Sequence, residues 1–146
     1  MANNLSNQIK TTRVMNAVAA GTSDQNSSSV NMSNFEAVRF TAAFGTITAG
    51  AATSVRVQQS ADNSNWDDLL GSDITVADDD DNQVVVLDIW RPIDRYVRVT
   101  VKRATQNAVI DGVVAEQYGP RLLPTTDDSA TVVAREIHNS PAEGTA

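Results

Sequence analysis

Hydrophobic and polar residues alternate over residues 97–102, within the sequence RYVRVTVKR at residues 95–103. Successive side chains of a β-strand point to opposite faces, so this alternation predicts a strand with one buried and one solvated face. The residues predicted to point inward are Val97, Val99 and Val101. Residues 36–44 show the same period, and Gly45 is predicted to end that strand. Its inward-pointing residues are predicted to be Val38, Phe40, Ala42 and Phe44.

Further short runs rich in β-branched residues predict more strands. They cover residues 53–60, 84–89, 109–118 and 130–137, with a weaker candidate over 9–18. Asn, Asp, Ser, Gly and Pro residues separate most of these runs, as is typical of turns. No window shows apolar residues at the spacing of an amphipathic helix. The pattern therefore predicts an all-β protein, an antiparallel β-sandwich of jelly-roll-like character.

The length of the chain indicates a single domain. Its 146 residues, 41% of them hydrophobic, suffice to bury one continuous core. We expect the sandwich domain over residues 9–123, between a polar N-terminal arm (1–8) and a C-terminal arm (124–146). The C-terminal arm includes the candidate strand over 130–137. The Ser- and Asn-rich residues 21–29 are predicted to form a flexible loop.

Most of the residue types needed for enzyme chemistry are missing or isolated. The absence of cysteine excludes a disulfide framework, a thiolate metal site and a cysteine nucleophile. The single histidine, His138, lies in the polar C-terminal segment, so one chain cannot assemble a histidine cluster. No P-loop, nucleophile elbow, zinc-protease motif or dinucleotide-binding glycine pattern occurs. The sequence predicts that the protein is not an enzyme and holds no cofactor.

Aspartates are concentrated in two short segments, Asp67–Asp68 and Asp78–Asp81. They could supply paired carboxylates for acid–base catalysis, but no apolar pocket beside them would raise the pKa of either partner. Calcium is the better alternative, because it prefers oxygen ligands, although the EF-hand pattern is absent. We interpret residues 78–81 as a solvated loop that binds no metal.

Charge is unevenly distributed along the chain, which carries a net charge of -7. This acidity opposes general nucleic-acid binding, which depends on neutralisation of phosphates by Lys and Arg. Residues 61–94 hold ten Asp and one Arg, whereas residues 95–123 hold five basic and two acidic residues. Such blocks favour self-association or docking on a patterned protein surface, the alternative being a mixed, solvated surface. No apolar run is long enough to cross a membrane, and no export signal is visible.

The polar face of the strand over residues 95–103 is the main candidate for an interaction surface. Tyr96, Arg98, Thr100 and Lys102 are predicted to lie together on it. We consider three interpretations: a solvated sheet face, a protein-binding face and a glycan site. The candidate interface residues are Trp90, Arg95, Tyr96, Arg98, Lys102, Arg103 and Tyr118.

Two resemblances to known families add to this picture. The sequence VRVQQSADNSNWDDL at residues 55–69, followed by RYVR at 95–98, resembles the order of strand, turn, Trp and RYVR in discoidin-type jelly-roll modules. Those modules carry a cysteine pair and more aromatic residues than this chain. The sequence LDIWRPIDRYVRVTVKRATQNAVIDGVVAEQYGPR at residues 87–121, within a match over 55–121, is similar to head decoration, or cement, proteins of tailed bacteriophages.

The second resemblance implies a β-rich protein that binds the major capsid protein on the exterior of an assembled capsid, often as a homotrimer. Such a protein is made in the host cytoplasm and ends in the virion, binding neither nucleic acid nor a membrane. In that setting, the polar arms are expected to cross onto a neighbouring subunit. The alternatives are a discoidin-like glycan-binding module on the virion and a tail or head-completion structural protein.

Overall fold

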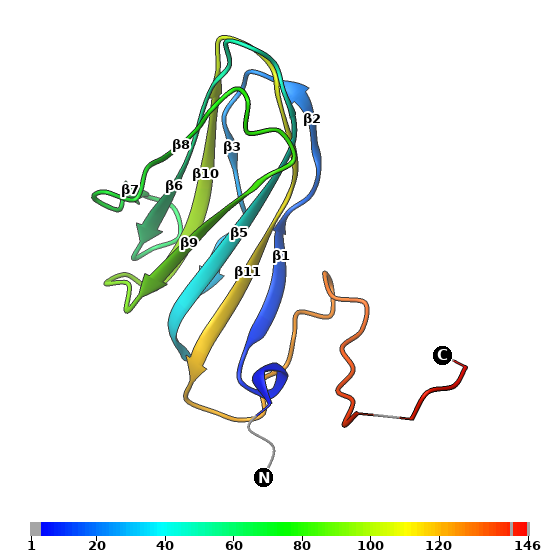
Figure 1. The fold of residues 1–146 in the computed structure, drawn as a ribbon. Coiled ribbons are helices and arrows are strands. Elements are labelled where there is room, and N and C mark those ends of the chain that lie inside the picture. Colours follow the sequence, from blue (N-terminus) through cyan, green and yellow to red (C-terminus); the bar gives the residue numbers. More distant parts are fainter. Residues whose placement is uncertain (1–3, 141, 146) are drawn as a thin grey trace.

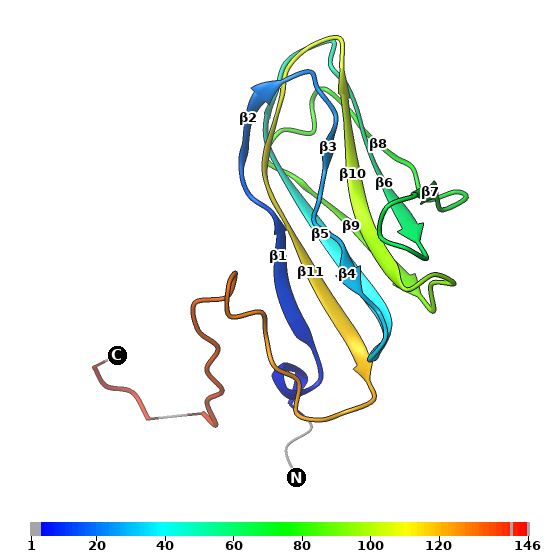
Figure 2. The same cartoon turned by 180° about the vertical axis from the view of Figure 1, so that it is seen from behind.

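The chain folds into two antiparallel β-sheets packed face to face, in agreement with the predicted β-sandwich (Figures 1 and 2). This computed structural model describes residues 4–140 and 142–145. Residues 1–3, 141 and 146 of the predicted arms lie outside the described residues. The strands are β1 (Lys10–Met15), β2 (Val18–Gly21), β3 (Gln25–Asn26), β4 (Val30–Asn31), β5 (Phe35–Ile47), β6 (Ala52–Ser60), β7 (Asp67–Asp68), β8 (Ile74–Val76), β9 (Val84–Trp90), β10 (Tyr96–Ala104) and β11 (Ala108–Pro120). One 3-10 turn, η1 (Leu5–Asn7), precedes β1.

Each sheet is built around long central strands. In the first, called the β5 sheet, the order is β1-β11-β5-β9, with β2 also paired to β11. In the second, called the β10 sheet, the order is β3-β10-β6-β7, with β4 paired to β10 and β8 to β6. Strands β5 and β11 continue for 13 residues each, so their side chains reach from one end of the sandwich to the other.

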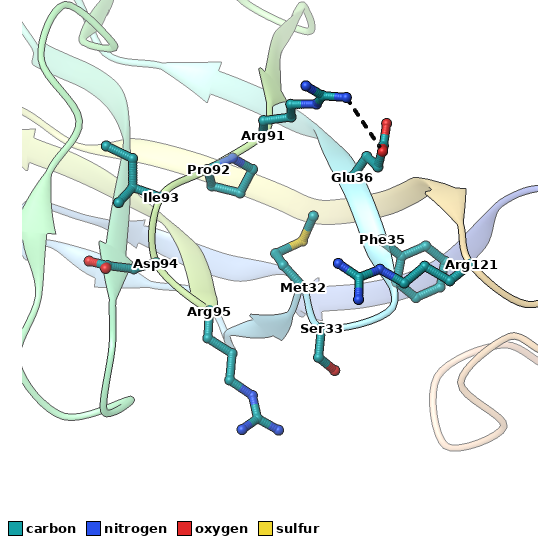
Figure 3. Close-up of a pocket in the computed structure, with 10 residues that line it drawn as sticks. All are labelled: Met32, Ser33, Phe35, Glu36, Arg91, Pro92, Ile93, Asp94, Arg95 and Arg121. Carbon is teal, nitrogen blue, oxygen red and sulfur yellow. Dashed lines mark ion pairs between the residues drawn. The ribbon is translucent and has the colours of Figure 1, made fainter.

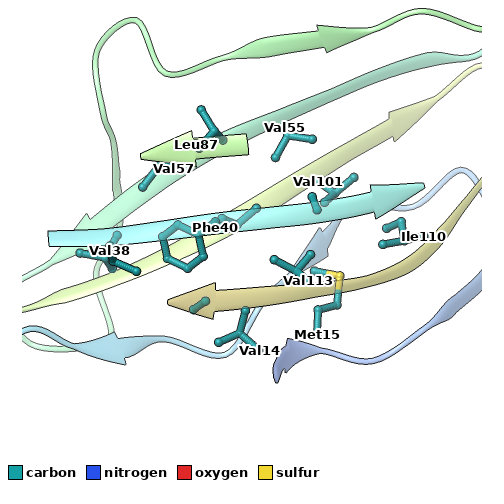
Figure 4. Packing of buried hydrophobic residues seen from close by; sticks show 14 of the residues in the cluster. Val14, Met15, Val38, Phe40, Val55, Val57, Leu87, Val101, Ile110 and Val113 are labelled. Atoms are coloured by element: carbon teal, nitrogen blue, oxygen red, sulfur yellow. The ribbon is translucent and has the colours of Figure 1, made fainter. Parts of the chain in front are cut away.

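The core lies between the two sheets and consists mainly of valine and other aliphatic residues (Figure 4). All inward-pointing residues predicted for β5 and β10 are buried there. These residues occupy every second position of each strand, so their side chains all point from the same face towards the opposite sheet. The largest fully buried side chains are Phe40, Phe44, Ile110, Val38, Val55, Val57, Val97, Val99, Val101 and Val113.

Several strands extend beyond their predicted ends. Strand β5 continues through Gly45 to Ile47, so the prediction that Gly45 ends the strand is wrong. A Cβ atom on Gly45 would lie 3.0 Å from Asp111 Oδ1 and 3.1 Å from Val109 Cγ1, so a larger residue would have to shift these two side chains. The predicted loop over residues 21–29 contains β3, which pairs with β10.

The C-terminal segment forms no strand over residues 130–137. Instead, its side chains bond to the free edge of β1: the Thr11 amide donates to Asp127 Oδ1 (2.8 Å) and the Arg13 amide to Thr131 Oγ1 (3.1 Å). Arg135 attaches the segment to the residues before β1 by donating to the carbonyl oxygens of Ser6 and Ile9, and it forms an ion pair with Asp127 (3.3 Å) within the segment. The β-branched composition predicts a strand, but side-chain oxygens accept the hydrogen bonds of the β1 amides on the edge where a backbone ladder would form.

The turn after β6 depends on Asp62, whose carboxylate accepts hydrogen bonds from the amides of Ser64 (2.9 Å) and Asn65 (2.8 Å). These backbone donors hold the pKa of Asp62 far below its usual range. A group whose pKa is lowered by folding stabilises the protein above its unfolded pKa, and that stabilisation is lost as the pH falls towards the folded pKa.

We therefore expect Asp62 to remain ionised when the pH is lowered through 3, as measured by NMR titration of its carboxyl carbon. The Asp62→Asn variant should unfold at a lower temperature at neutral pH, and this difference should shrink as the pH falls below about 4. A carboxyl carbon that titrates with the ordinary pKa of an aspartate would contradict the described hydrogen bonds.

Candidate interaction surfaces

The outer face of the β10 sheet carries the predicted ledge of Tyr96, Arg98 and Lys102, but its cations already have partners. The Arg98 guanidinium lies over the ring of Trp66 at 4.2 Å, and its Nε donates to Gln58 Oε1 (2.9 Å). Lys102 Nζ forms an ion pair with Asp24 Oδ2 (2.8 Å), and the hydrogen bond from Lys102 lowers the pKa of Asp24. Burial lowers the pKa of Arg98. The charged groups of Arg98 and Lys102 on this face therefore already have partners within the chain.

Two residues of this strand are not available on the surface. Thr100 is buried, and its hydroxyl lies within hydrogen-bond distance of Asn26 Oδ1 (2.8 Å) and Gln58 Oε1 (3.0 Å). Arg103, predicted as an interface residue, is only 3% exposed. Its guanidinium donates to three backbone carbonyl oxygens, those of Ser23 (2.8 Å), Ala19 (2.9 Å) and Ala108 (2.7 Å). Arg103 is a structural residue that joins three segments of the chain.

Trp90 and Tyr118 lie on the outer face of the other sheet, away from Tyr96. Both are paired with Ala37 in the register of the β5 sheet, and their ring centroids are 6.2 Å apart. The Tyr118 hydroxyl donates to Asp88 Oδ1 (2.7 Å), and this hydrogen bond raises the pKa of Tyr118 to about 12. Of the predicted candidates, Tyr96, Arg98 and Lys102 lie on one outer face, Trp90 and Tyr118 on the opposite one, and Arg103 is buried.

A third surface lies at the end of the sandwich, where the loop between β9 and β10 meets the start of β5 and the end of β11 (Figure 3). It surrounds a hollow of about 370 Å³, called here the arginine hollow. The residues that line it are Met32, Ser33, Phe35, Glu36, Arg91, Pro92, Ile93, Asp94, Arg95 and Arg121. Their sequence positions are scattered, so only the strand order reveals that they share one site.

The arginine hollow combines free cationic groups with an exposed apolar side chain. Ile93 is 91% exposed at the tip of the loop. Arg91 has a positive φ of 51°, a conformation that is uncommon for a residue other than glycine, and its guanidinium is 3.6 Å from Glu36. The Arg95 guanidinium donates to Asn31 Oδ1 (3.1 Å) and lies 5.4 Å from the centroid of the Tyr96 ring, while the Arg121 guanidinium has no ion pair or hydrogen bond to the described residues.

The Asp78–Asp81 loop supports the fold through its carboxylates. The Gly50 amide donates to Asp78 Oδ2 (2.5 Å), the Ala77 amide to Asp80 Oδ2 (2.9 Å) and the Ile47 amide to Asp81 Oδ1 (2.5 Å). These bonds tie the loop to the turn between β5 and β6. Within residues 4–140 and 142–145, no group of three or more His, Cys, Asp or Glu side chains is arranged to hold a metal ion.

The architecture belongs to the class of two-sheet antiparallel β-sandwiches. It is similar to the crystal structure of PBSX exported protein XepA, with a TM-score of 0.53 and 14% sequence identity. The match covers 94% of this chain and 46% of XepA, so this chain spans less than half the length of that protein. At this identity, the similarity shows a shared fold. No family model and no curated protein matches the sequence.

No helix in the described part of the chain is long and apolar enough to cross a membrane.

Proposed function

We propose that this protein is a structural virion protein that decorates the exterior of a tailed-phage capsid as a homotrimer, binding the lattice of the major capsid protein. The resemblance of residues 55–121 to head decoration proteins in overall sequence pattern is the starting point for this role, and no family model matches the chain. The fold that it shares with XepA is compatible with a virion protein. The alternating charge blocks favour docking on another protein surface.

The arginine hollow is the observation that carries the proposal. An exposed isoleucine among arginines has the composition of an interface centre, where an apolar anchor and guanidinium groups bury together against a partner. Arg95 and Arg121 have no carboxylate partner in the described chain, so they are available to acidic groups on a capsid surface. Ile93, at the opposite side of the hollow from Arg121, supplies the apolar contact (Figure 3).

A decoration protein of this kind stabilises a capsid through mass action. It binds the assembled lattice and not the free subunits, so each occupied site stabilises the assembled state by RT ln(1 + [L]/Kd). A trimer adds multivalency, because the second and third contacts form at a high effective concentration once the first has formed.

Co-sedimentation with undecorated capsids, assembled from the cognate major capsid protein, tests this proposal. The charge-reversed variant Arg95→Glu/Arg121→Glu should bind at least about tenfold more weakly than the unchanged protein, equivalent to about 1.4 kcal/mol. The affinity of the unchanged protein should also fall as salt is added, because salt screens charges on exposed surfaces.

The matched control is Lys10→Glu/Arg13→Glu, which makes the same change of charge on β1, away from the arginine hollow. This control should bind capsids nearly as well as the unchanged protein. Equal losses in both variants would mean that only net charge matters and would remove the hollow from the mechanism. Failure of the unchanged protein to bind any assembled capsid would overturn the proposed function, and binding to tails alone would favour a tail protein.

A further inference from the structure

The outer face of the β5 sheet exposes an aromatic surface around Trp90, whose ring centroid lies 5.4 Å from the guanidinium carbon of Arg91. Trp90 is 57% exposed, although it belongs to a strand whose other face is part of the core. It packs against Tyr118 above Ala37, whose small side chain leaves room for the two rings. The hydrogen bond from Tyr118 to Asp88 fixes the tyrosine ring. The pair is therefore a prearranged aromatic platform.

A row of charged side chains lies next to this platform, two residues further along the strands. Arg39 of β5 is paired directly with Glu116 of β11 on one side and with Asp88 of β9 on the other. Among the described residues, Arg39 nevertheless forms no ion pair and no side-chain hydrogen bond. Arg39, Glu116 and the second carboxylate oxygen of Asp88, whose Oδ1 accepts from Tyr118, thus remain able to bind a ligand.

We propose that this face of the β5 sheet is a saccharide-binding site, formed by Trp90, Tyr118 and the charged row Asp88–Arg39–Glu116. The inference goes beyond the proposed capsid role and does not depend on it. Sugar rings present C–H groups that pack on aromatic faces, and their neighbouring hydroxyls each donate and accept hydrogen bonds. Adjacent carboxylate and guanidinium groups match that pattern, because the carboxylates accept and the guanidinium donates.

The mixture of charges argues against a simple ion as the ligand. Asp88 and Glu116 would repel an anion, and Arg39 between them would repel a cation. A neutral polyhydroxylated ligand satisfies all three groups without adding charge. The aromatic platform supplies the remaining contact area, since Trp and Tyr combine a large apolar face with a polar atom.

The shape beside the charged row also suits a small ligand. A hollow of about 400 Å³ opens over Arg39, Asp88 and Glu116, and this volume falls within the usual range of about 300–1,000 Å³ for ligand sites. Tyr118 lines it on the platform side, and Leu5 of η1 contributes an apolar wall. The segment before β1 thus forms part of the site.

Tryptophan fluorescence gives a direct test, because the chain has only two tryptophans. In the Trp66→Phe variant, Trp90 is the only tryptophan, so its emission reports on the proposed site alone. This variant is titrated with soluble oligosaccharides of glucose, galactose, mannose, rhamnose and N-acetylglucosamine. We expect at least one of them to change the emission saturably at millimolar concentration or below. Absence of saturable binding to every member of the panel would overturn the proposal.

Arg39→Ala, made in the same background, should weaken binding of that oligosaccharide at least tenfold, while its melting curve shows that it remains folded. Tyr96→Ala is the matched control, because it removes an aromatic ring from the opposite face and should leave binding unchanged. If emission from Trp90 responds to assembled capsids and to no sugar, the face is a protein contact and the inference is wrong. Capsid binding by Trp90→Ala, measured separately, keeps this outcome distinct from failure of the proposed function.

Discussion

Replacing Arg103 by methionine is expected to lower the free energy of unfolding by about 3–5 kcal/mol. The methionine side chain fills much of the space of the arginine stem, so the loss comes mainly from hydrogen bonds. Without the guanidinium, the carbonyl oxygens of Ser23, Ala19 and Ala108 lose their donor. The Ala108 carbonyl is buried, so leaving it without a donor is costly, whereas Ala19 and Ser23 are exposed and their carbonyls lose only the net value of each bond. Chemical denaturation of both proteins measures the difference.

The neighbouring residue supplies a matched control. Lys102→Met removes a cation at the next position, but its ion pair with Asp24 is exposed to solvent, and such pairs contribute less than about 1 kcal/mol. Both substitutions change the net charge equally. Similar losses for the two variants would show that Arg103 reaches solvent and that its role in the fold is wrongly described.

Replacing Phe40 by alanine is expected to cost a comparable amount, about 3–5 kcal/mol. Phe40 lies at the centre of β5 and is 1% exposed within the core between the sheets (Figure 4). Its removal leaves a cavity that the surrounding valines cannot fill without moving the strands. The loss combines the transfer of apolar surface with the missing dispersion contacts around the cavity.

Thr41→Ala is the control for this substitution, because Thr41 follows in the same strand and points to the outer face. It should change the free energy of unfolding by less than about 1 kcal/mol. A larger loss at Thr41 than at Phe40 would mean that the register of β5 is shifted by one residue, since such a shift exchanges the two faces.

Local periodicity predicted the faces of the long strands, because one buried face imposes a period of two on the sequence. Arg103 illustrates this alternation. It occupies the alternate position that follows Val97, Val99 and Val101 along β10, and it is buried with them despite its charge. The prediction that Arg103 lies on the surface followed its charge rather than the period. The donors of the guanidinium find backbone carbonyls inside, and Gly21 leaves the space beside it.

The sites could not be assembled from the sequence in the same way. Tyr96 and Trp90 are six residues apart in sequence, yet they lie on opposite faces, because β9 and β10 belong to different sheets. Arg121 joins Arg95 at one end only because β11 and β10 belong to opposite sheets that end together there. Strand order depends on contacts between distant segments, about which periodicity within one strand carries no information. For the same reason, the sequence around Arg39 could not predict that it lies between Asp88 and Glu116.

The side-chain cover on β1 has a consequence for how copies of this protein can polymerise. Molecules can pair into a continuous fibre only when each one exposes two unpaired strand edges, because each molecule must bond to a neighbour on both sides. Asp127 and Thr131 cap the β1 edge, and the outer strands of the β10 sheet are two or three residues long. Among the described strands, β9 alone leaves a long unpaired edge, of seven residues. Two molecules can join there edge to edge, but the joined pair offers no second long edge, so growth by strand pairing stops at two and the proposed trimer has to form through other surfaces.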